Sequence, residues 1–294
     1  MASKRSSASK RPTQQQRNAR EQMRIKQQQA AARRRRINII IGASVAVAVV
    51  IIVIILWQVL PRNTPEPPEG TPSNPAIFIP PNGTAEMGWI EIKSPDAKPG
   101  ALVVDEHTDY QCPWCEVADK FYGASMQELA ARGDIILRIH VRTMVGDRML
   151  KNDDSVRAAQ AATCADTIGK FPAYHEVVFA NQPTHEGDGY TDDQLRIDFA
   201  AKAGITGDDL TKFQACYDSG ETKAYVLGME RVNWTSTTIN GGTNDPVQGT
   251  PMFFVNGKPM EWGTMVARQP DQTIVPTVDT TPDGLLAHLK SVAG

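Results

Sequence analysis

The sequence contains few cysteines and no internal repeat, so the chain is not an array of repeats. Only four of its 294 residues are cysteine, and none precedes Cys112. No second Cys-x-x-Cys pair accompanies Cys112-Pro-Trp-Cys115. A structural zinc site needs four ligands at close range, so the lack of a second pair argues against zinc. No metal is therefore expected.

The first 36 residues lack acidic side chains apart from Glu21. Twelve Lys or Arg against this one acid give the segment a charge of about +11, and since the whole chain carries -2, the remainder carries about -13. The segment is also poor in apolar residues, which predicts a disordered tail. Basic tails are typical of nucleic-acid-binding proteins, but the next segment favours a topology signal, and no nucleic-acid partner is expected.

Residues 37–60 lack charged side chains altogether. As a helix, these 24 residues would be about 36 Å long, enough to cross a bilayer core. Four arginines at 33–36 precede the run, and the positive-inside rule keeps the tail in the cytoplasm and the C-terminal part outside. A cleaved signal peptide is the alternative, but residues 60–63 offer no small-x-small cleavage site. We predict a single-pass membrane protein whose main domain is extracytoplasmic.

Residues 61–76 are rich in proline and form a predicted extended tether between the membrane span and the globular part, 77–294. The four cysteines all belong to this globular part. An even number of cysteines in an oxidising compartment favours disulfide bonds.

Hydrophobic periodicity predicts a strand at 101–107, a helix at 116–132 and a second strand at 135–141. Gly133 supplies the stop signal of this helix. Strand, helix and strand make a βαβ unit, whose crossover should be right-handed and whose strands should be parallel.

The following region, about 152–235, has helical spacing and no convincing strand. Within it, Thr191 and Gln194 form a predicted capping box. A strand at 252–255, a hairpin turn at Asn256-Gly257 and a partner strand over 259–262 come next, before a final helix at 282–292. The order is therefore βαβ, helical block, ββ and α. We predict an α/β, thioredoxin-like fold with an all-helical insertion, preceded by a transmembrane helix.

The pair Cys112 and Cys115 carries the predicted chemistry. Cysteine exchanges disulfides as its thiolate, and Cys112 falls at a strand-to-helix junction where helix N–H groups stabilise an anion. Cys115 lies one turn later and is expected to be the more buried, resolving thiol. Pro113 suits the first helical turn, where its missing N–H is not needed. Trp114 adds an apolar surface beside the reactive sulfur.

The segment 104–115, Val-Asp-Glu-His-Thr-Asp-Tyr-Gln-Cys-Pro-Trp-Cys, resembles the active-site segment of DsbA-like thiol–disulfide oxidoreductases of the membrane-anchored, Gram-positive or actinobacterial type. The segment 249–257, Gly-Thr-Pro-Met-Phe-Phe-Val-Asn-Gly, resembles the Thr–cis-Pro loop of the same family. The two motifs flank a helical insertion in the family's order, and the similarity covers roughly residues 90–294. Segments 233–248 and 263–280 depart from the pattern, which puts strand boundaries there in doubt.

The resemblance implies further site residues. Pro251 would be cis and lie against the cysteine pair, leaving the Thr250 backbone free to pair with an incoming peptide. Glu106, six residues before Cys112, would be buried beneath the disulfide and exchange a proton with Cys115. The alternatives are an ordinary trans proline and a solvent-facing acid.

Cys164 and Cys216 are separate from the redox pair. Packing of the helices that carry them would bring them together, and some DsbA-like proteins of Gram-positive type have a comparable structural disulfide. Two buried free thiols are the alternative.

The predicted function is an extracytoplasmic dithiol oxidase that introduces disulfides into unfolded secreted proteins with reduced cysteines. Its redox group is the Cys112–Cys115 disulfide, and no other cofactor is expected. The resemblance implies a membrane reoxidase as partner, either DsbB-like or similar to vitamin K epoxide reductase. A reductase or isomerase of the same fold, or a redox-inert anchored chaperone, are the alternatives.

Overall fold

The structure is a computed structural model that describes residues 77–86, 88–235 and 249–294. All described elements lie in one compact unit, Asn74–Gly294. Within the described residues, no helix is long and apolar enough to span a membrane. The predicted basic tail, transmembrane helix and tether fall outside the described residues, so they stay predictions.

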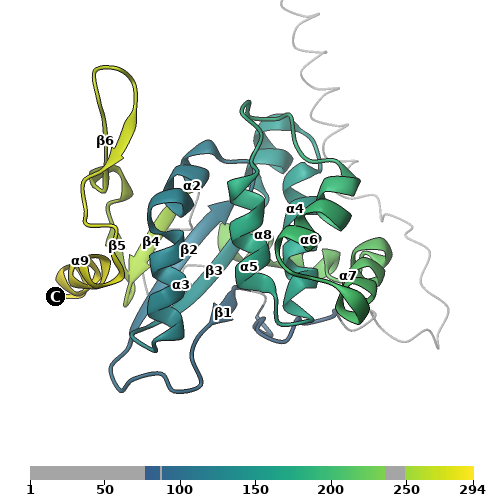
Figure 1. Ribbon diagram of the computed structural model, residues 1–294, viewed down its shortest axis with the longest axis horizontal. Helices are drawn as coiled ribbons and strands as arrows, with labels where there is room; N and C mark the ends of the chain where they lie inside the picture. Colours follow the sequence, from purple (N-terminus) through teal and green to yellow (C-terminus); the bar gives the residue numbers. More distant parts are fainter. Residues whose placement is uncertain (1–76, 87, 236–248) are drawn as a thin grey trace, which may run out of the picture. The chain divides into compact units, whose positions relative to one another are not determined.

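A five-stranded sheet forms the centre of the unit, in the order β1-β3-β2-β4-β5 (Figure 1). The strands are β1 (Ile90–Ile92), β2 (Leu102–Asp109), β3 (Ile135–Arg142), β4 (Met252–Val255) and β5 (Lys258–Met260). β2 and β3 are parallel, as predicted, because a helical crossover joins them, and all other pairs are antiparallel. Sequence reasoning missed β1, whose three residues are too few to show a period.

One long helical segment follows β2 and carries the Cys-x-x-Cys motif. It consists of α2 (Pro113–Ala118), a π-helical turn η1 (Asp119–Gly123) and α3 (Ala124–Ala131), and we call it the redox helix. It begins at Pro113, which agrees with the prediction that this proline lies in the first helical turn, three residues before the stretch with helical spacing. A side chain at position 123 would collide with the Asp119 carboxylate, which explains the glycine there. The chain leaves the helix through Gly133, whose φ of 72° favours glycine.

The predicted all-helical insertion is present between β3 and β4 (Figure 1). Its elements are η2 (Val145–Leu150), α4 (Asp154–Asp166), α5 (Phe171–Ala180), η3 (Gln194–Asp198), α6 (Phe199–Lys202), α7 (Gly207–Ser219) and α8 (Lys223–Thr235). The predicted capping box forms before η3: the Thr191 N–H donates to Gln194 Oε1 at 2.8 Å, and the Gln194 N–H donates to Thr191 Oγ1 at 3.1 Å.

Side-chain alternation along β2 assigns its residues to the two faces of the sheet. His140 of β3 bonds to Asp105 of β2 and to Asn233 of α8, so this face is covered by the insertion. Successive residues of a strand point to opposite faces. Glu106 therefore points to the other face, where it interacts electrostatically with Asp119 of the redox helix.

The C-terminal part contains the predicted hairpin and helix. Asn256 and Gly257 have φ values of 48° and 78°, as a two-residue turn between β4 and β5 requires. The partner strand is shorter than predicted, because η4 (Trp262–Thr264) follows Met260 almost at once. The predicted final helix is α9 (Pro282–Ala293), capped by the Thr281 hydroxyl. These elements complete a thioredoxin-like α/β fold.

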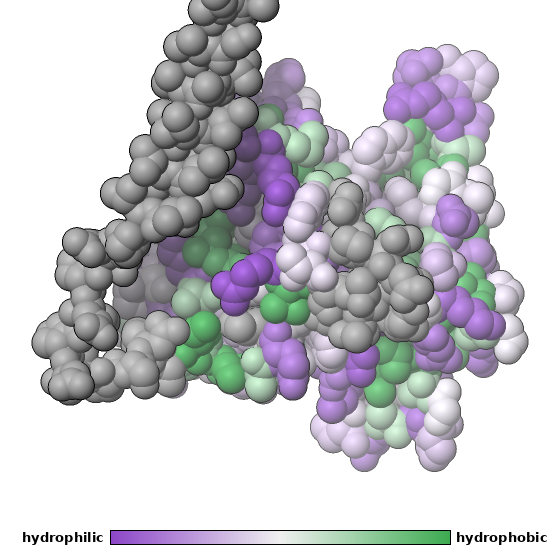
Figure 2. All heavy atoms as spheres, turned by 180° about the vertical axis from the view of Figure 1, so that it is seen from behind, coloured by the Kyte–Doolittle hydropathy of each residue, from purple (hydrophilic) through white to green (hydrophobic). Residues whose placement is uncertain are grey.

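The irregular stretch 263–280 forms a second, two-stranded sheet of β6 (Val266–Arg268) and β7 (Ile274–Pro276). It projects from the side of the unit in Figure 1, and Figure 2 shows its tip as a lobe of hydrophilic residues. The Tyr122 hydroxyl of the redox helix bonds to the carbonyls of Met265 and Val278 at 2.8 and 3.2 Å. The base of the projection is thus attached directly to the redox helix.

Candidate redox site

The two cysteines of the motif lie at the N-terminal end of the redox helix. Cys112 is the N-cap of α2, with an extended backbone, and Pro113 is the first helical residue. Cys115 lies one turn later, and both thiols are free. Cys112 is 7% exposed and Cys115 is 0% exposed, so the predicted order of burial holds, although Cys112 is more enclosed than an exposed nucleophile.

The surroundings of the pair shift the pKa values of the two thiols in opposite directions. Hydrogen bonding from the Cys115 thiol lowers the pKa of Cys112 to about 6, against the opposing effect of burial, with help from the Thr250 side chain and from backbone N–H groups at Cys115 and Trp114. Burial raises the pKa of Cys115 well above its ordinary value, and the interaction with Cys112 raises it further. At neutral pH the reduced pair therefore holds its negative charge on Cys112.

Thr250 lies against this sulfur, although it is 138 positions away from Cys112 in the chain. The Thr250–Pro251 peptide bond is cis, and the Cys112 thiol donates to the Thr250 carbonyl oxygen at 3.5 Å. The pairing of β4 with β2 produces this proximity, because Met252 of β4 lies opposite His107 of β2. The structure thus brings together the two motifs that the sequence places far apart.

A recess opens beside Cys112, between the redox helix and the β6–β7 sheet. Its lining residues are Trp114, Thr250, Pro251, Trp262, Gly263, Val266, Arg268 and Ile274. Trp114 is 41% exposed, and the Arg268 guanidinium carbon lies 5.7 Å from the centre of its ring. Sequence reasoning identified Trp114 but missed Arg268, because no periodicity or motif relates two residues so far apart. The recess thus combines aromatic and aliphatic side chains with one positive charge, that of Arg268.

Residues of the helical insertion hold the turn before Cys112 in place, and sequence reasoning missed them too. The Gln182 side-chain amide donates to the carbonyls of Tyr110 and Cys112 at 2.8 and 3.1 Å. The Tyr190 hydroxyl donates to the Tyr110 carbonyl at 2.6 Å. Within the described residues, no cluster of His, Cys, Asp or Glu side chains could hold a metal ion.

Glu106 is buried on the sheet face that carries the redox helix, and is 6% exposed. Burial raises the pKa of its carboxyl to about 7. An acid that titrates near neutral pH can both accept and release a proton, which suits exchange with Cys115. That role stays a prediction, since burial and position alone do not show a transfer.

Replacement of Glu106 by Gln is expected to remove a pH dependence of stability. The folded carboxyl titrates near 7 instead of 4.5, so from pH 4.5 to 7 the folded state holds a proton that the unfolded state has lost. Stability therefore falls as pH rises through this window, by about 3 kcal/mol at most. Urea unfolding of the oxidised proteins at pH 5 and pH 8 measures this loss. An equal loss in wild type and Glu106→Gln would contradict the assignment.

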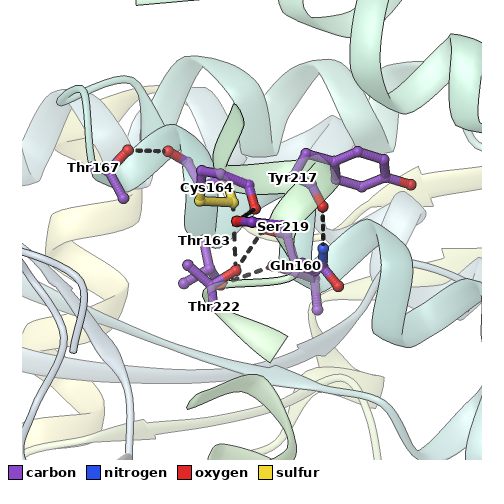
Figure 3. Close-up of a disulfide and its surroundings, with 9 residues drawn as sticks. Gln160, Thr163, Cys164, Thr167, Tyr217, Ser219 and Thr222 are labelled. Carbon is purple, nitrogen blue, oxygen red and sulfur yellow. Dashed lines mark hydrogen bonds between the residues drawn. A yellow bond between two sulfur atoms is a disulfide. The ribbon is translucent and has the colours of Figure 1, made fainter. Parts of the chain in front are cut away.

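Cys164 of α4 and Cys216 of α7 form a disulfide, with an S–S distance of 2.03 Å and a sequence separation of 52 (Figure 3). Cys164 is fully buried and Cys216 is 5% exposed. Further hydrogen bonds join the same elements: the Gln160 side-chain amide of α4 donates to the Tyr217 carbonyl of α7 at 2.7 Å, and the Thr222 hydroxyl donates to the Gln160 carbonyl at 3.2 Å. The disulfide thus belongs to the packing of the insertion.

Comparisons with known proteins agree with this fold. The chain resembles the MdbA thiol-disulfide oxidoreductase of Corynebacterium diphtheriae, with 20% identity and a TM-score of 0.50 over 64% of this chain and 90% of that one. It resembles the MdbA protein of Actinomyces oris with 17% identity and a TM-score of 0.52 over 72% of this chain and 92% of that one. It also resembles reduced DsbA from Mycobacterium tuberculosis, with 24% identity and a TM-score of 0.50 over 70% of this chain and 92% of that one. No curated protein sequence matches. The family model described as thioredoxin matches residues 95–268, more than half of the chain. The chain therefore belongs to the thioredoxin family.

Proposed function

We propose that this protein is an extracytoplasmic thiol–disulfide oxidoreductase that introduces disulfides into secreted proteins through Cys112-Pro-Trp-Cys115. One observation carries the proposal: a thiol with a lowered pKa sits at a helix N-terminus, one turn from a buried second thiol. The shared fold with proteins described as thiol-disulfide oxidoreductases supports it.

The reaction is an exchange of electron pairs between sulfurs. A substrate thiolate attacks Cys112 Sγ of the oxidised protein, which breaks the Cys112–Cys115 bond and forms a mixed disulfide. Cys115 leaves as a thiolate and takes up a proton, because its pKa is raised. A second substrate thiolate attacks the substrate's own sulfur and releases Cys112 as a thiolate. The substrate is oxidised to a disulfide, and the protein is reduced to the dithiol.

The low pKa of Cys112 favours oxidation of substrates over reduction. Stabilisation of a thiolate lowers the free energy of the reduced protein, so its disulfide becomes a stronger oxidant. A reductase or isomerase would instead need a reduced form with less stabilisation. The difference in burial between the two thiols also makes Cys112 the sulfur that a substrate reaches.

The recess beside Cys112 would receive the polypeptide around a substrate cysteine. The Thr250 backbone lies next to Cys112 and at the start of β4, where an extended peptide can add hydrogen bonds. Trp114, Val266 and Ile274 offer apolar contact that does not require one particular side chain in the substrate. Such a surface suits many unfolded substrates, as a general oxidase requires.

The location and partners follow from the sequence. The uncharged run 37–60 and the arginines at 33–36 would anchor the protein in the cell membrane, with the redox domain outside and the N-terminus in the cytoplasm. After each cycle the dithiol must return its electrons to a membrane reoxidase, DsbB-like or similar to vitamin K epoxide reductase. An anchor would keep the redox site near such a partner.

The equilibrium of the Cys112–Cys115 pair with glutathione tests the direction of the reaction. We expect a potential well above the value of about -270 mV typical of thioredoxin, together with rapid oxidation of a reduced two-cysteine peptide. Mass spectrometry after acid quenching would measure the fraction of oxidised protein. A potential near that of thioredoxin, with fast insulin reduction, would assign the protein to the reductases instead.

A further inference from the structure

The Asp109 carboxyl group belongs to the last residue of β2, directly before the turn that leads to the redox helix, and is completely buried. Its Oδ1 accepts from the Gln111 N–H at 2.9 Å and from the Ser155 hydroxyl at 2.8 Å. Its Oδ2 accepts from the Val145 N–H at 2.9 Å. Its backbone carbonyl accepts from the Cys112 N–H at 3.0 Å. One residue thus joins the turn that positions Cys112 to η2 and to the first turn of α4.

The direction of these hydrogen bonds shows which charge state the contacts favour. Ser155 Oγ already accepts from the Gly146 N–H at 3.1 Å and from the Gln111 side-chain amide at 2.9 Å. Its single proton is therefore directed to Asp109. All three contacts of the carboxyl group are donors, and donors favour the carboxylate over the neutral acid.

Burial works against that charge. It raises the pKa of Asp109 to about 7, the three donors lower it, and the nearby Cys112 raises it again. Asp109 is therefore balanced between its two forms near neutral pH, and the charge on Cys112 affects this balance. The surrounding elements also carry other charged or titratable groups. They are Cys112, Cys115, Arg142 with its partner Glu230, Asp147 and Arg148 of η2, Asp154 and Arg157 of α4, Tyr110 and Tyr190.

Among these groups, only the cysteine pair changes its charge when the site is reduced. In the disulfide, Cys112 carries no charge. In the reduced pair, its thiolate places a second negative charge in the same buried turn, and two like charges in a medium of low dielectric constant repel strongly. Arg142 pairs with Glu230 at 2.9 Å, so its charge is already balanced by that carboxylate.

We propose that Asp109 is a positioning residue for Cys112 whose carboxyl group takes up a proton when the Cys112–Cys115 disulfide is reduced. Two electrons from substrate thiols break the disulfide, Cys115 takes one proton, and Asp109 takes a fraction of a second proton from solvent. The Asp109 carboxylate repels the Cys112 thiolate, so it limits how far the thiolate stabilises the reduced protein. Because the same carboxyl group bonds to η2 and α4, its charge is also linked to the contact with the insertion. The proposal rests on the proposed function only in taking Cys112 and Cys115 as the redox pair.

Two variants distinguish the effect of the Asp109 charge from the effect of the hydrogen bonds that hold its position. Asp109→Asn removes the charge and leaves the Val145 N–H facing an amide. Ser155→Ala keeps the charge but removes three hydrogen bonds of the same junction. In glutathione equilibria at pH 8, where Asp109 is ionised, we expect Asp109→Asn to shift the equilibrium about tenfold toward the reduced protein. Ser155→Ala should shift it less than about threefold. Equal shifts in both variants would overturn the proposal.

A titration of the wild-type protein decides the question even if Asp109→Asn does not fold. The carboxyl carbon signal of Asp109 in NMR spectra reports its pKa separately in the oxidised and reduced proteins. We expect the pKa to be about one unit higher in the reduced protein. Equal values in the two forms would exclude proton uptake at Asp109. Both measurements compare variants or redox forms of the same protein. A failure of the proposed oxidase activity would instead appear in the wild-type potential and in the peptide assay.

Discussion

Replacement of Cys112 by serine is expected to abolish peptide oxidation, whereas replacement of Cys115 should leave a protein that forms mixed disulfides but does not resolve them. Cys112 is the thiol with the lowered pKa and the only one of the two with any exposed surface. Serine cannot form the disulfide, so the rate of oxidation should fall to that of the uncatalysed reaction, on the order of a thousandfold or more.

The Cys115→Ser variant reports the first chemical step alone. Its Cys112 thiolate should attack a disulfide-containing peptide and stay joined to it, because no second thiol is present to displace the peptide. Intact-mass spectrometry without reductant would show this adduct. The Cys112→Ser variant should give little or none, since Cys115 is fully buried and its pKa is raised. Adducts of equal yield in both variants would contradict the assignment of Cys112 as the nucleophile.

A third variant serves as the matched control. Joint replacement of Cys164 and Cys216 by alanine removes both sulfurs of the other cysteine pair, in a different part of the fold. As long as this variant is folded, we expect it to oxidise the peptide at close to the wild-type rate. Strong loss of activity in the folded variant would show that the second disulfide participates in exchange.

Most of the redox centre could be predicted because its residues are adjacent in the sequence. Cys112 and Pro113 follow a strand and begin a helix, so local rules place the thiol at the helix N-terminus. The hairpin at Asn256-Gly257 and the capping box at Thr191 depend on two to four residues, and the structure confirms both. Short-range patterns of this kind are set by the backbone and need no tertiary context.

The residues that surround the centre could not be predicted in the same way. Arg268 reaches Trp114 only because a second sheet forms at 266–276, and Gln182 reaches the Cys112 carbonyl from the far end of α5. The three donors to Asp109 come from residues 2 to 46 positions away in the chain. Such contacts depend on how elements pack, which periodicity does not specify.

Loss of the Cys164–Cys216 disulfide is expected to destabilise the protein by about 4 kcal/mol, because the cross-link restricts a loop of 52 residues in the unfolded chain. The double alanine variant tests this in urea. Each single alanine variant loses the same cross-link, so the double variant should be only slightly less stable than either one. Additive losses would mean that packing of the side chains, not the cross-link, supplies the stability.

The two disulfides should respond to reduction in opposite directions. An oxidising pair is one whose reduced form is the more stable, so selective reduction of Cys112–Cys115 should raise the urea midpoint. Reduction of Cys164–Cys216 should lower it, and full burial of Cys164 should make this bond resistant to mild reductants. Stepwise reduction, followed by urea unfolding at each step, should therefore give first a rise and then a fall in stability. A lower urea midpoint after the first step would contradict the oxidase assignment. It would not contradict the structural role of the second disulfide.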